Sequence, residues 1–313
     1  MKRKLIATLL VLLLVGCMAG ALVGCTPTDN SVLSADGNWR YTVEDVYYVE
    51  ADAEGNLVND TVQKHVKVTL LHYEGNAANV TVPATVDGHT VTDIADSLFM
   101  LTANEKDGWK MRDTYAINTT LKSVTFDFAA KRISNLCFYQ CAELTSITFP
   151  ASLAQVGDFA FFGCKKLTGV TLTLSEQTEM VYTAATKAQQ KDLSSAIDAA
   201  KATFGADKIN LFVRTPQTLK PGIGGYAFRE CAALGDMNLV SSILPTIGDK
   251  AFYVVDENAD DDNQYVIIPG LTIHVATALP LYNAEDIEQH RIKTKINDYR
   301  YWIEYINAEI IVA

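Results

Sequence analysis

The sequence predicts a solenoid of mixed α/β class that is mostly β, and two observations carry this prediction. First, apolar residues recur every 23 residues: Leu121, Leu144 and Leu167; Val124, Ile147 and Val170; Phe126, Phe149 and Leu172; Cys141 and Cys164. Second, an Ile or Val precedes a Phe by five residues in five places: Ile94 and Phe99, Ile133 and Phe138, Val156 and Phe161, Ile223 and Phe228, Ile247 and Phe252. Fixed periods of this kind are the signature of stacked repeat units.

Each repeat unit reads Ile-x4-Phe-x2-Cys-x2-Leu-x2-Val-x-Phe. The Leu-x2-Val-x-Phe part alternates apolar and polar residues, which is the period of a short strand with one buried face. We interpret Ile-x4-Phe as a compact return segment. One such coil cannot bury its apolar side alone, whereas stacked copies form a continuous core. Four glycines, Gly157, Gly163, Gly224 and Gly248, are expected where the coil bends.

These repeats resemble the BspA-like leucine-rich repeat family of bacterial and protist surface proteins. Residues 72–94 are similar to the family's opening module, with Pro83 and the Asp87-Gly88 turn at the family's positions. Residues 271–275 and 282–284 resemble its closing strand and helix. The resemblance covers about residues 68–285 with gaps. It implies a right-handed stack of coils that presents a binding surface outside the cell.

Segments on both sides of the repeats are expected to cap the solenoid, because an exposed end coil would offer unpaired edges. Residues 41–50 and 65–71 alternate like two strands joined through a turn at residues 54–56, and residues 299–312 are rich in aromatic and β-branched side chains. The predicted order is a signal peptide at 1–24, a tether at 25–36, a β-rich N-terminal cap at 37–82, repeats at 83–172, a helix–strand insertion at 173–222, repeats at 223–279 and a C-terminal cap at 280–313.

Three stretches interrupt the repeats: residues 100–120, residues 173–220 and the acidic run 256–263. Within the longest one, apolar residues step by four, three and four, which predicts an amphipathic helix closed by Gly205, followed by a strand at 209–213. The helix positions are Leu193, Ile197, Ala200 and Phe204. Insertions in solenoids map to loops on one face, which is often the recognition face.

The amino terminus has the order of a secretory signal, with a basic start at residues 2–4 and an apolar run at residues 5–15. The tetrapeptide Leu-Val-Gly-Cys ends at Cys17 and again at Cys25, and it resembles the bacterial lipobox, in which the Cys is lipidated. We prefer Cys25, because a polar stretch follows it, and keep Cys17 as the alternative. An uncleaved anchor is a further alternative, since residues 5–24 are long enough to span a bilayer. Each version exports the rest of the chain.

The net charge of −11 and the pI near 4.9 exclude nucleic acid as an expected partner, because phosphate binding needs clustered Lys and Arg. No catalytic motif is recognisable, and residues 222–225 are interpreted as a turn because Ile223 is a repeat position. The protein is therefore expected to be no enzyme and to need no cofactor. An envelope hydrolase with its site at residues 173–220 is kept as an alternative.

Cysteine spacing indicates packing more than metal binding or cross-linking. Cys141, Cys164 and Cys231 occupy one repeat position, where a free Cys behaves as a small apolar residue. Cys137 lies four residues before Cys141, and a disulfide between them is the alternative. Zinc is not expected, because no Cys-x2-Cys ligand set occurs.

Two sets of polar residues are candidate binding sites. The acidic run contains Asp260, Asp261 and Asp262, a weak candidate for a cation site that lacks EF-hand spacing, so a solvated loop is the simpler reading. Outward positions of the predicted strands form the second set, a ladder of small polar side chains suited to a broad partner: Ser123, Thr125, Ser146, Thr148, Thr171, Asp236 and Asn238. The alternative is that these are β-favouring residues on a wet face.

Together these features predict a surface lipoprotein that binds an extracellular protein or glycan, touches the membrane only through its N-terminal lipid, and is monomeric. Relatives in the resembling family are implicated in adhesion to host matrix and to other bacteria. A passive structural or solute-capturing envelope protein is the remaining alternative.

Overall fold

A computed structural model describes residues 30–102, 115–241, 245–255, 265–275 and 309–312. The predicted signal peptide, Cys17, Cys25 and the acidic run with Asp260, Asp261 and Asp262 lie outside these described residues. So does most of the predicted C-terminal cap.

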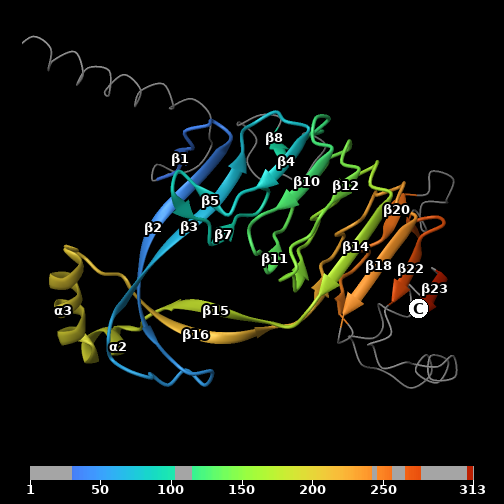
Figure 1. Cartoon of the computed structure of the whole chain (residues 1–313). Coiled ribbons are helices and arrows are strands. Elements are labelled where there is room, and N and C mark those ends of the chain that lie inside the picture. The colour runs from blue at the N-terminus through green and yellow to red at the C-terminus, as the bar shows by residue number, and fades with distance from the viewer. Residues whose placement is uncertain (1–29, 103–114, 242–244, 256–264, 276–308, 313) are drawn as a thin grey trace, which may run out of the picture.

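The repeats form a parallel ladder of strands along one side of a solenoid (Figure 1). One panel contains β4 (Asn79–Val82), β10 (Ser123–Phe126) and β12 (Ser146–Ile147), and the second contains β14 (Gly169–Leu174), β18 (Asp236–Ser241), β22 (Thr272–Val275) and β23 (Glu309–Val312). Ser123 pairs with Ser146 in register, so one coil equals one 23-residue repeat. The sequence assigned residues 79–82 to the cap, but β4 pairs with β10 and is the first strand of the ladder.

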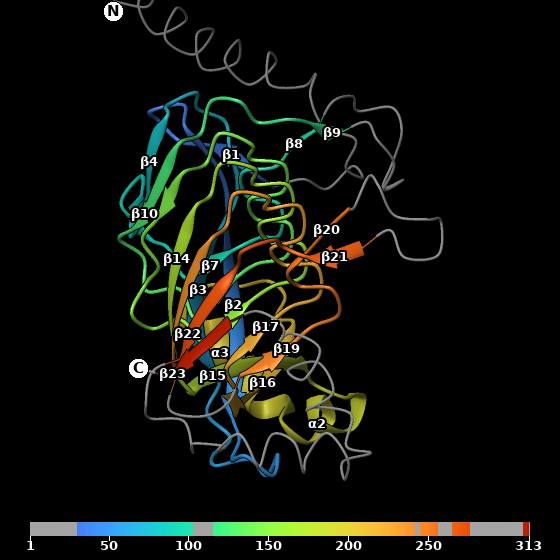
Figure 2. The ribbon, with the colours of Figure 1, turned by 90° about the vertical axis from the view of Figure 1, so that its right-hand side faces the viewer.

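A second, shorter sheet lies on another side of the same coils (Figure 2). Its strands are β11 (Arg132–Ile133), β13 (Gln155–Val156), β17 (Gly222–Ile223) and β19 (Thr246–Ile247), each paired in parallel with the next. The Ile or Val of each strand is buried, while the side chains of the preceding Arg132, Gln155 and Thr246 face outward and Gly222 has none. The predicted return segment therefore begins with a two-residue strand.

The five repeat phenylalanines form one continuous column in the core. Successive ring centroids of Phe99, Phe138, Phe161, Phe228 and Phe252 lie 5.1, 4.9, 5.0 and 5.5 Å apart, and the interplanar angles do not exceed 14°. Stacked coils with a shared apolar interior are thus confirmed. Offset aromatic pairs at this spacing add about 0.5–1.5 kcal/mol each beyond the burial of their area.

Three of the four glycines expected at bends do lie there, directly after a short strand, but glycine is needed for a reason other than the turn itself. Gly163 alone has a left-handed backbone, with φ +73°. At Gly157 and Gly224 a Cβ would lie 2.6 Å from atoms of the adjacent coil, and Gly248 is closer still to its neighbour's backbone. Glycine is present at these positions because adjacent coils approach too closely for a side chain.

Several bulky residues adopt the left-handed backbone that glycine usually occupies. Leu136, Phe159 and Tyr226, each three residues after the buried Ile or Val of the short sheet, have φ of +57°, +55° and +57°. Such a backbone costs an L-residue of this size about 1–2 kcal/mol. The ring stack of Phe159 on Tyr226, with centroids 4.8 Å apart, offsets about 0.5–1.5 kcal/mol of that cost.

The predicted N-terminal strands are β2 (Trp39–Glu50) and β3 (Gln63–Tyr73), an antiparallel pair that packs Trp39 against Phe99 of the first coil. β7 (Asp93–Ile94) pairs with β3, and β1 (Val32–Leu33) pairs with β2. The tether predicted to residue 36 is therefore shorter than expected, because residues 32–36 are held against the fold.

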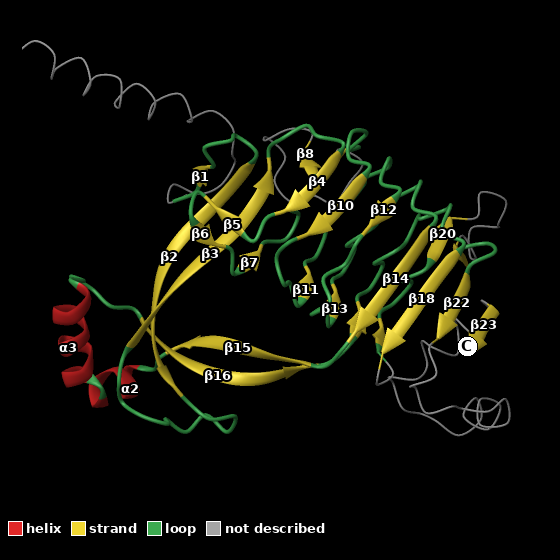
Figure 3. Cartoon of the chain, viewed as in Figure 1, coloured by secondary structure: helices red, strands yellow, loops and turns green. Residues whose placement is uncertain are grey.

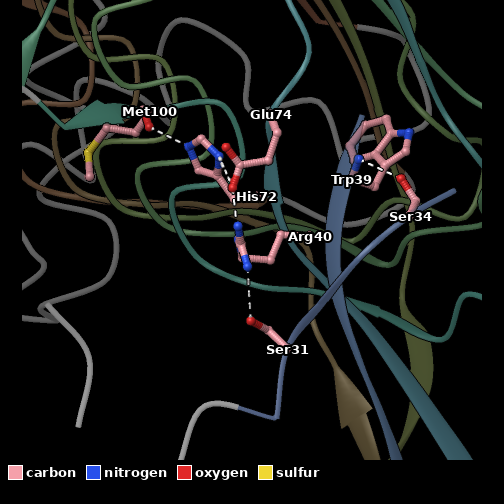
Figure 4. Close-up of polar contacts among 7 residues, drawn as sticks. All are labelled: Ser31, Ser34, Trp39, Arg40, His72, Glu74 and Met100. Atoms are coloured by element: carbon pink, nitrogen blue, oxygen red, sulfur yellow. Dashed lines mark hydrogen bonds and ion pairs between the residues drawn. The ribbon is translucent and has the colours of Figure 1, made fainter. Parts of the chain in front are cut away.

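Polar contacts fix this join between the N-terminal segment and the first coil (Figure 4). The Arg40 Nε donates to Glu74 Oε1 at 2.8 Å, and the Trp39 backbone N–H donates to Ser34 Oγ at 2.9 Å. The His72 Nε2 lies 2.9 Å from the Met100 carbonyl oxygen. The His72 contact connects β3 to the residue that follows Phe99, and the other two hold the N-terminal segment together.

The long insertion runs back along the solenoid to the N-terminal hairpin (Figures 1 and 3). It consists of β15 (Gln177–Ala184), α2 (Lys187–Asp192), α3 (Ser194–Phe204) and β16 (Leu211–Leu219). α3 lies where the sequence predicted a helix and ends at Gly205, whose φ is +66°. β16 pairs with β15 and, in parallel, with the end of β2. We call β15, β16 and the far halves of β2 and β3 the bridge.

The bridge has its own apolar core, separate from that of the coils, formed by Tyr47, Val49, Ala51, Val62, Ala185, Leu193, Ala200, Leu211 and Val213. Between the two cores, residues 43–45 of β2 are exposed. Short pairs complete the fold: β5 (Thr85–Val86) with β6 (His89–Thr90), β8 (Leu101–Thr102) with β9 (Tyr115–Ala116), and β20 (Tyr253–Val255) with β21 (Tyr265–Ile267). No helix among the described residues is long and apolar enough to cross a membrane.

Candidate binding surfaces

The predicted ladder residues all lie on the outer side of the long strands. Ser123 is half-buried and the other six are exposed. β10 sets Ser123 beside Asn79 and Thr125 beside Thr81, and β18 sets Asn238 beside Thr171. The structure therefore brings the predicted residues into two rows that run along the solenoid.

The rows extend beyond the residues that the sequence singled out. Asn79 and Thr81 continue them at one end, and Thr272 and His274, paired with Asp236 and Asn238, continue them at the other. β4 and β22 show the same alternation of buried and outward residues as the repeat strands. This alternation is the sequence signal that could have extended the ladder to them. β12 and β14 are not paired as neighbouring strands, so the two panels are separate sheets.

Side chains within a row bond to one another across the strands. Ser123 Oγ donates to Asn79 Oδ1 at 2.7 Å, and the hydroxyl oxygens of Thr81 and Thr125 lie 2.9 Å apart. Asn238 Nδ2 donates to Thr171 Oγ1 at 3.4 Å in the second panel, and His274 Nε2 lies 3.4 Å from Asp236 Oδ1 of the other row. The surface is flat and carries hydroxyl and amide groups with few charges, so it suits hydrogen bonding to a broad, neutral partner.

In the part of the chain that the structure describes, the side chains of the insertion mainly contact other parts of the fold and do not form an open binding site. Arg214 of β16 donates through Nη1 to Glu50 Oε1 at 2.8 Å, and its guanidinium carbon lies 5.0 Å from the Tyr48 ring centre. At the start of β15, Glu179 pairs with Arg132 of the short sheet at 2.6 Å. Of the residues that the structure describes, no group of three His, Cys, Asp or Glu side chains could hold a metal ion.

A shallow depression of ≈ 300 Å³ lies over the short sheet, where Gly222 leaves a gap in the row of outward side chains. Its polar groups largely connect the coils to one another. Asn135 Oδ1 accepts from the Asp158 N–H at 2.9 Å, and Asp158 Oδ1 accepts from the Gly225 N–H at 2.7 Å. We interpret these side chains as cross-coil braces.

The four repeat-region cysteines are free, buried thiols, so the disulfide alternative for Cys137 and Cys141 is wrong. The Sγ atoms of Cys164 and Cys231 donate to carbonyl oxygens of the preceding coil at 3.3 and 3.1 Å. Burial raises the pKa of the Cys137, Cys141 and Cys164 thiols above the ordinary value. These thiols pack the core, and their high pKa values make them poor nucleophiles.

The model of one protein family, described as "BspA type Leucine rich repeat region", matches the repeat region in six copies. The matched residues are 112–211 and 202–259. Residues 112–259 are a BspA-type leucine-rich repeat region. Proteins of this family are typically bacterial surface proteins, and they are typically scaffolds without enzymatic activity. A comparison with curated protein sequences gives no match.

Three solved bacterial structures are similar to this chain. A leucine-rich repeat protein of T. pallidum is 17% identical, with a TM-score of 0.37 over 80% of this chain and 70% of that one. A leucine-rich repeat protein of Bacteroides ovatus is 17% identical, with a TM-score of 0.33 over 75% and 42%. A leucine-rich cell surface protein of Faecalibacterium prausnitzii is 16% identical, with a TM-score of 0.30 over 82% and 73%.

Proposed function

We propose that this protein is a cell-surface lipoprotein that binds an extracellular protein or glycan through the polar ladder and acts in adhesion. The observation that carries the proposal is the ladder itself: two exposed rows of hydroxyl and amide side chains in register along a rigid stack of coils. The partner's identity is left open. The proposal includes a lipid on Cys25, with Cys17 as the alternative, and a monomeric protein with β2 and β3 as its N-terminal cap.

The geometry supports a broad, weakly charged contact. Of the seven ladder residues, Asp236 alone carries a charge. The core column fixes each coil against the next, so a partner meets a surface that is already ordered. Pre-ordering lowers the entropic cost of binding.

Deletion of residues 173–220 is unsuitable as a test of this proposal, because it would remove the strand that pairs with Tyr47–Glu50 of β2.

Point substitutions on the ladder separate binding from folding. Bacteria that display the full chain are applied to immobilised matrix proteins and to a glycan array. Thr125→Arg and Asn238→Arg place a large charge on each panel, whereas Ala202→Arg places the same charge on an exposed position of α3.

Loss of adhesion in the two ladder variants, with adhesion kept in Ala202→Arg, is the expected result. Equal adhesion by all variants would show that the ladder is not the contact surface. If the wild-type chain adheres to nothing, the passive structural role is favoured. Metabolic labelling with a fatty acid tests the anchor: Cys25→Ala is expected to abolish labelling and Cys17→Ala to leave it unchanged.

A further inference from the structure

A second surface lies away from the ladder, over the turns that contain the core phenylalanines and over the start of β21. At outward positions of these turns the coils carry large aromatic side chains in place of polar ones. We call it the aromatic surface, and it consists of Tyr139, Phe159, Phe162, Tyr226, Arg229 and Tyr265. Tyr265 is 37% exposed, and the other five are partly buried.

The rings of this surface are organised by stacking, which leaves their edges outward. Tyr139 stacks on Phe162 with centroids 5.0 Å apart, and Phe159 stacks on Tyr226 at 4.8 Å. Each ring has one face covered by its stacking partner, and Arg229 lies over Phe162 and Tyr226 as well, so few faces are available to sugar rings, which bind on aromatic faces. The edges carry the positive part of the ring quadrupole, which favours an electronegative partner group.

Arg229 lies at the centre of the aromatic surface. Its guanidinium carbon lies 4.3 Å from the ring centre of Tyr265, 5.4 Å from that of Tyr226 and 5.7 Å from that of Phe162. The side chain keeps 17% of its surface exposed. Lys250 adds a second cation, with Nζ 4.7 Å from the Tyr265 ring centre.

Arg229 differs from the other described arginines in its carboxylate partner. Arg40, Arg132 and Arg214 each lie within 2.6–2.8 Å of a Glu oxygen. Arg229 Nε lies 3.6 Å from Glu230 Oε1, and this N–H has no hydrogen-bond acceptor among the described residues. Glu230 Oε1 instead accepts from the Val255 N–H at 3.1 Å. A largely desolvated guanidinium thus has a longer ion pair than the other described arginines, although Arg214 Nε also has no acceptor among the described residues.

Two of the aromatic residues occupy strained positions of the coil. Phe159 and Tyr226 adopt the left-handed backbone that glycine would adopt without strain, and their stacking offsets the strain only in part. Tyr, Phe and Arg are the residues enriched at protein interfaces, whereas the Ser and Thr of the ladder are under-represented among binding hot spots.

We propose that the aromatic surface is a docking site for a protein partner, which inserts an Asp or Glu side chain against Arg229. Charge complementarity identifies the occupant: a caged guanidinium and Lys250 call for a carboxylate, and the surrounding ring edges exclude water from the pair. Physiological salt screens the chain's distant negative charges beyond about 8 Å, so the carboxylate that an acidic partner competes with is Glu230, 3.6 Å from Arg229 Nε. Asp249 is a second nearby carboxylate, and its Oδ2 accepts from the Tyr226 hydroxyl at 3.1 Å. This surface is separate from the ladder, so either binding proposal can be refuted while the other stands.

The test is selection of random phage-displayed peptides on the purified full chain, followed by binding measurements with synthetic copies of the enriched peptides. Three variants are compared with wild type. Arg229→Met keeps the packing against the rings but removes the charge, and Arg229→Lys keeps the charge but loses the planar fork. Arg214→Met is the matched control, because Arg214 also packs on aromatic rings but already has Glu50 as a carboxylate partner. Circular dichroism confirms that each variant is folded.

We expect peptides that contain Asp or Glu, that bind Arg229→Met about tenfold more weakly or worse, and that lose as much affinity when the acid is changed to Asn or Gln. The peptide affinity of Arg229→Lys is expected to lie between those of wild type and Arg229→Met. Arg214→Met is expected to bind the peptides like wild type. Selection of no Arg229-dependent peptide, or full binding after the acid is neutralised, would overturn the proposal. Arg229-dependent binding of polygalacturonate without any peptide would also overturn it, in favour of an acidic glycan.

The chain's own acidic run is a competing occupant, and a further variant tests it. Asp260→Asn, Asp261→Asn and Asp262→Asn are combined in one chain and assayed with the same peptides. Unchanged affinity supports a carboxylate supplied by a partner. Affinity that rises by about tenfold would show that the chain's own acids occupy Arg229, and would overturn the proposal.

Discussion

The substitution Gly224→Ala tests the close approach of adjacent coils directly. A Cβ at this position would lie 2.6 Å from the Asp158 backbone nitrogen and 2.6 Å from the Gly157 carbonyl carbon. Real contacts of this kind need about 3.4 Å, so the two coils would have to separate by roughly 0.8 Å. The cross-coil bonds from Gly224 N to Val156 O at 2.7 Å and from Gly225 N to Asp158 Oδ1 at 2.7 Å would then lengthen beyond useful range.

Each of these bonds contributes about 0.5–1.5 kcal/mol, and the core column loses part of its packing as well. Replacing Gly with Ala recovers about 0.4–1 kcal/mol by restricting the unfolded chain. The expected net loss is therefore about 2–3 kcal/mol in the free energy of unfolding. Urea unfolding monitored by far-ultraviolet circular dichroism measures it, provided that the m-value is unchanged.

Gly169→Ala is the matched control for this experiment. Gly169 lies on the ladder, where the nearest atom to an added Cβ is the Asp236 carbonyl oxygen at 3.7 Å, an ordinary contact. This variant is expected to be as stable as wild type or slightly more so. If Gly224→Ala instead unfolds within about 0.5 kcal/mol of Gly169→Ala, the glycines do not set the coil separation and the reasoning is refuted.

Three further perturbations test the core, the thiols and the bridge. Phe161→Ala opens the middle of the column and is expected to lower the free energy of unfolding by about 3–5 kcal/mol, measured with urea. Phe149→Ala, at the partly buried edge of the column, is expected to lower it clearly less, and equal losses would contradict the column. Burial raises the thiol pKa values, so the stabilising neutral form is fully present below the unfolded pKa near 8.5. Stability is therefore expected to fall as pH rises above that value, by at most about 1.4 kcal/mol per pH unit for each thiol, and a flat urea midpoint between neutral and alkaline pH would contradict this. Glu50→Gln removes the partner of Arg214 and is expected to speed amide hydrogen exchange in β16 while leaving the coil amides protected; faster exchange throughout the coils would show that the bridge and the solenoid unfold as one unit.

The repeat region could be read from the sequence because its information is local and periodic. A column of Phe side chains needs only that each coil place the same residue at the same height, and the 23-residue step states this directly. The outward ladder followed from the same alternation, since successive strand residues point to opposite faces. The sequence matched residues 271–275 to a closing strand but did not extend the ladder to β4 or β22, and it assigned β23, the last strand of the second panel, to the C-terminal cap.

The role of the repeat glycines illustrates where periodicity stops being informative. Gly157, Gly224 and Gly248 are conspicuous in the sequence, but a glycine at a turn and a glycine at a close approach look alike there. The distinction is a distance between coils, which depends on how the neighbours pack.

Tertiary structure alone decided where the insertion goes. The sequence predicted α3 and a strand after it from local patterns, but the partner of that strand lies 164 positions away at the Arg214–Glu50 pair. The aromatic surface was equally hidden, because Phe162, Arg229 and Tyr265 come from three separate segments of the chain. Local hydrogen bonding and side-chain alternation are set by neighbouring residues, whereas a parallel strand pair or a caged arginine exists only once distant segments share the same space.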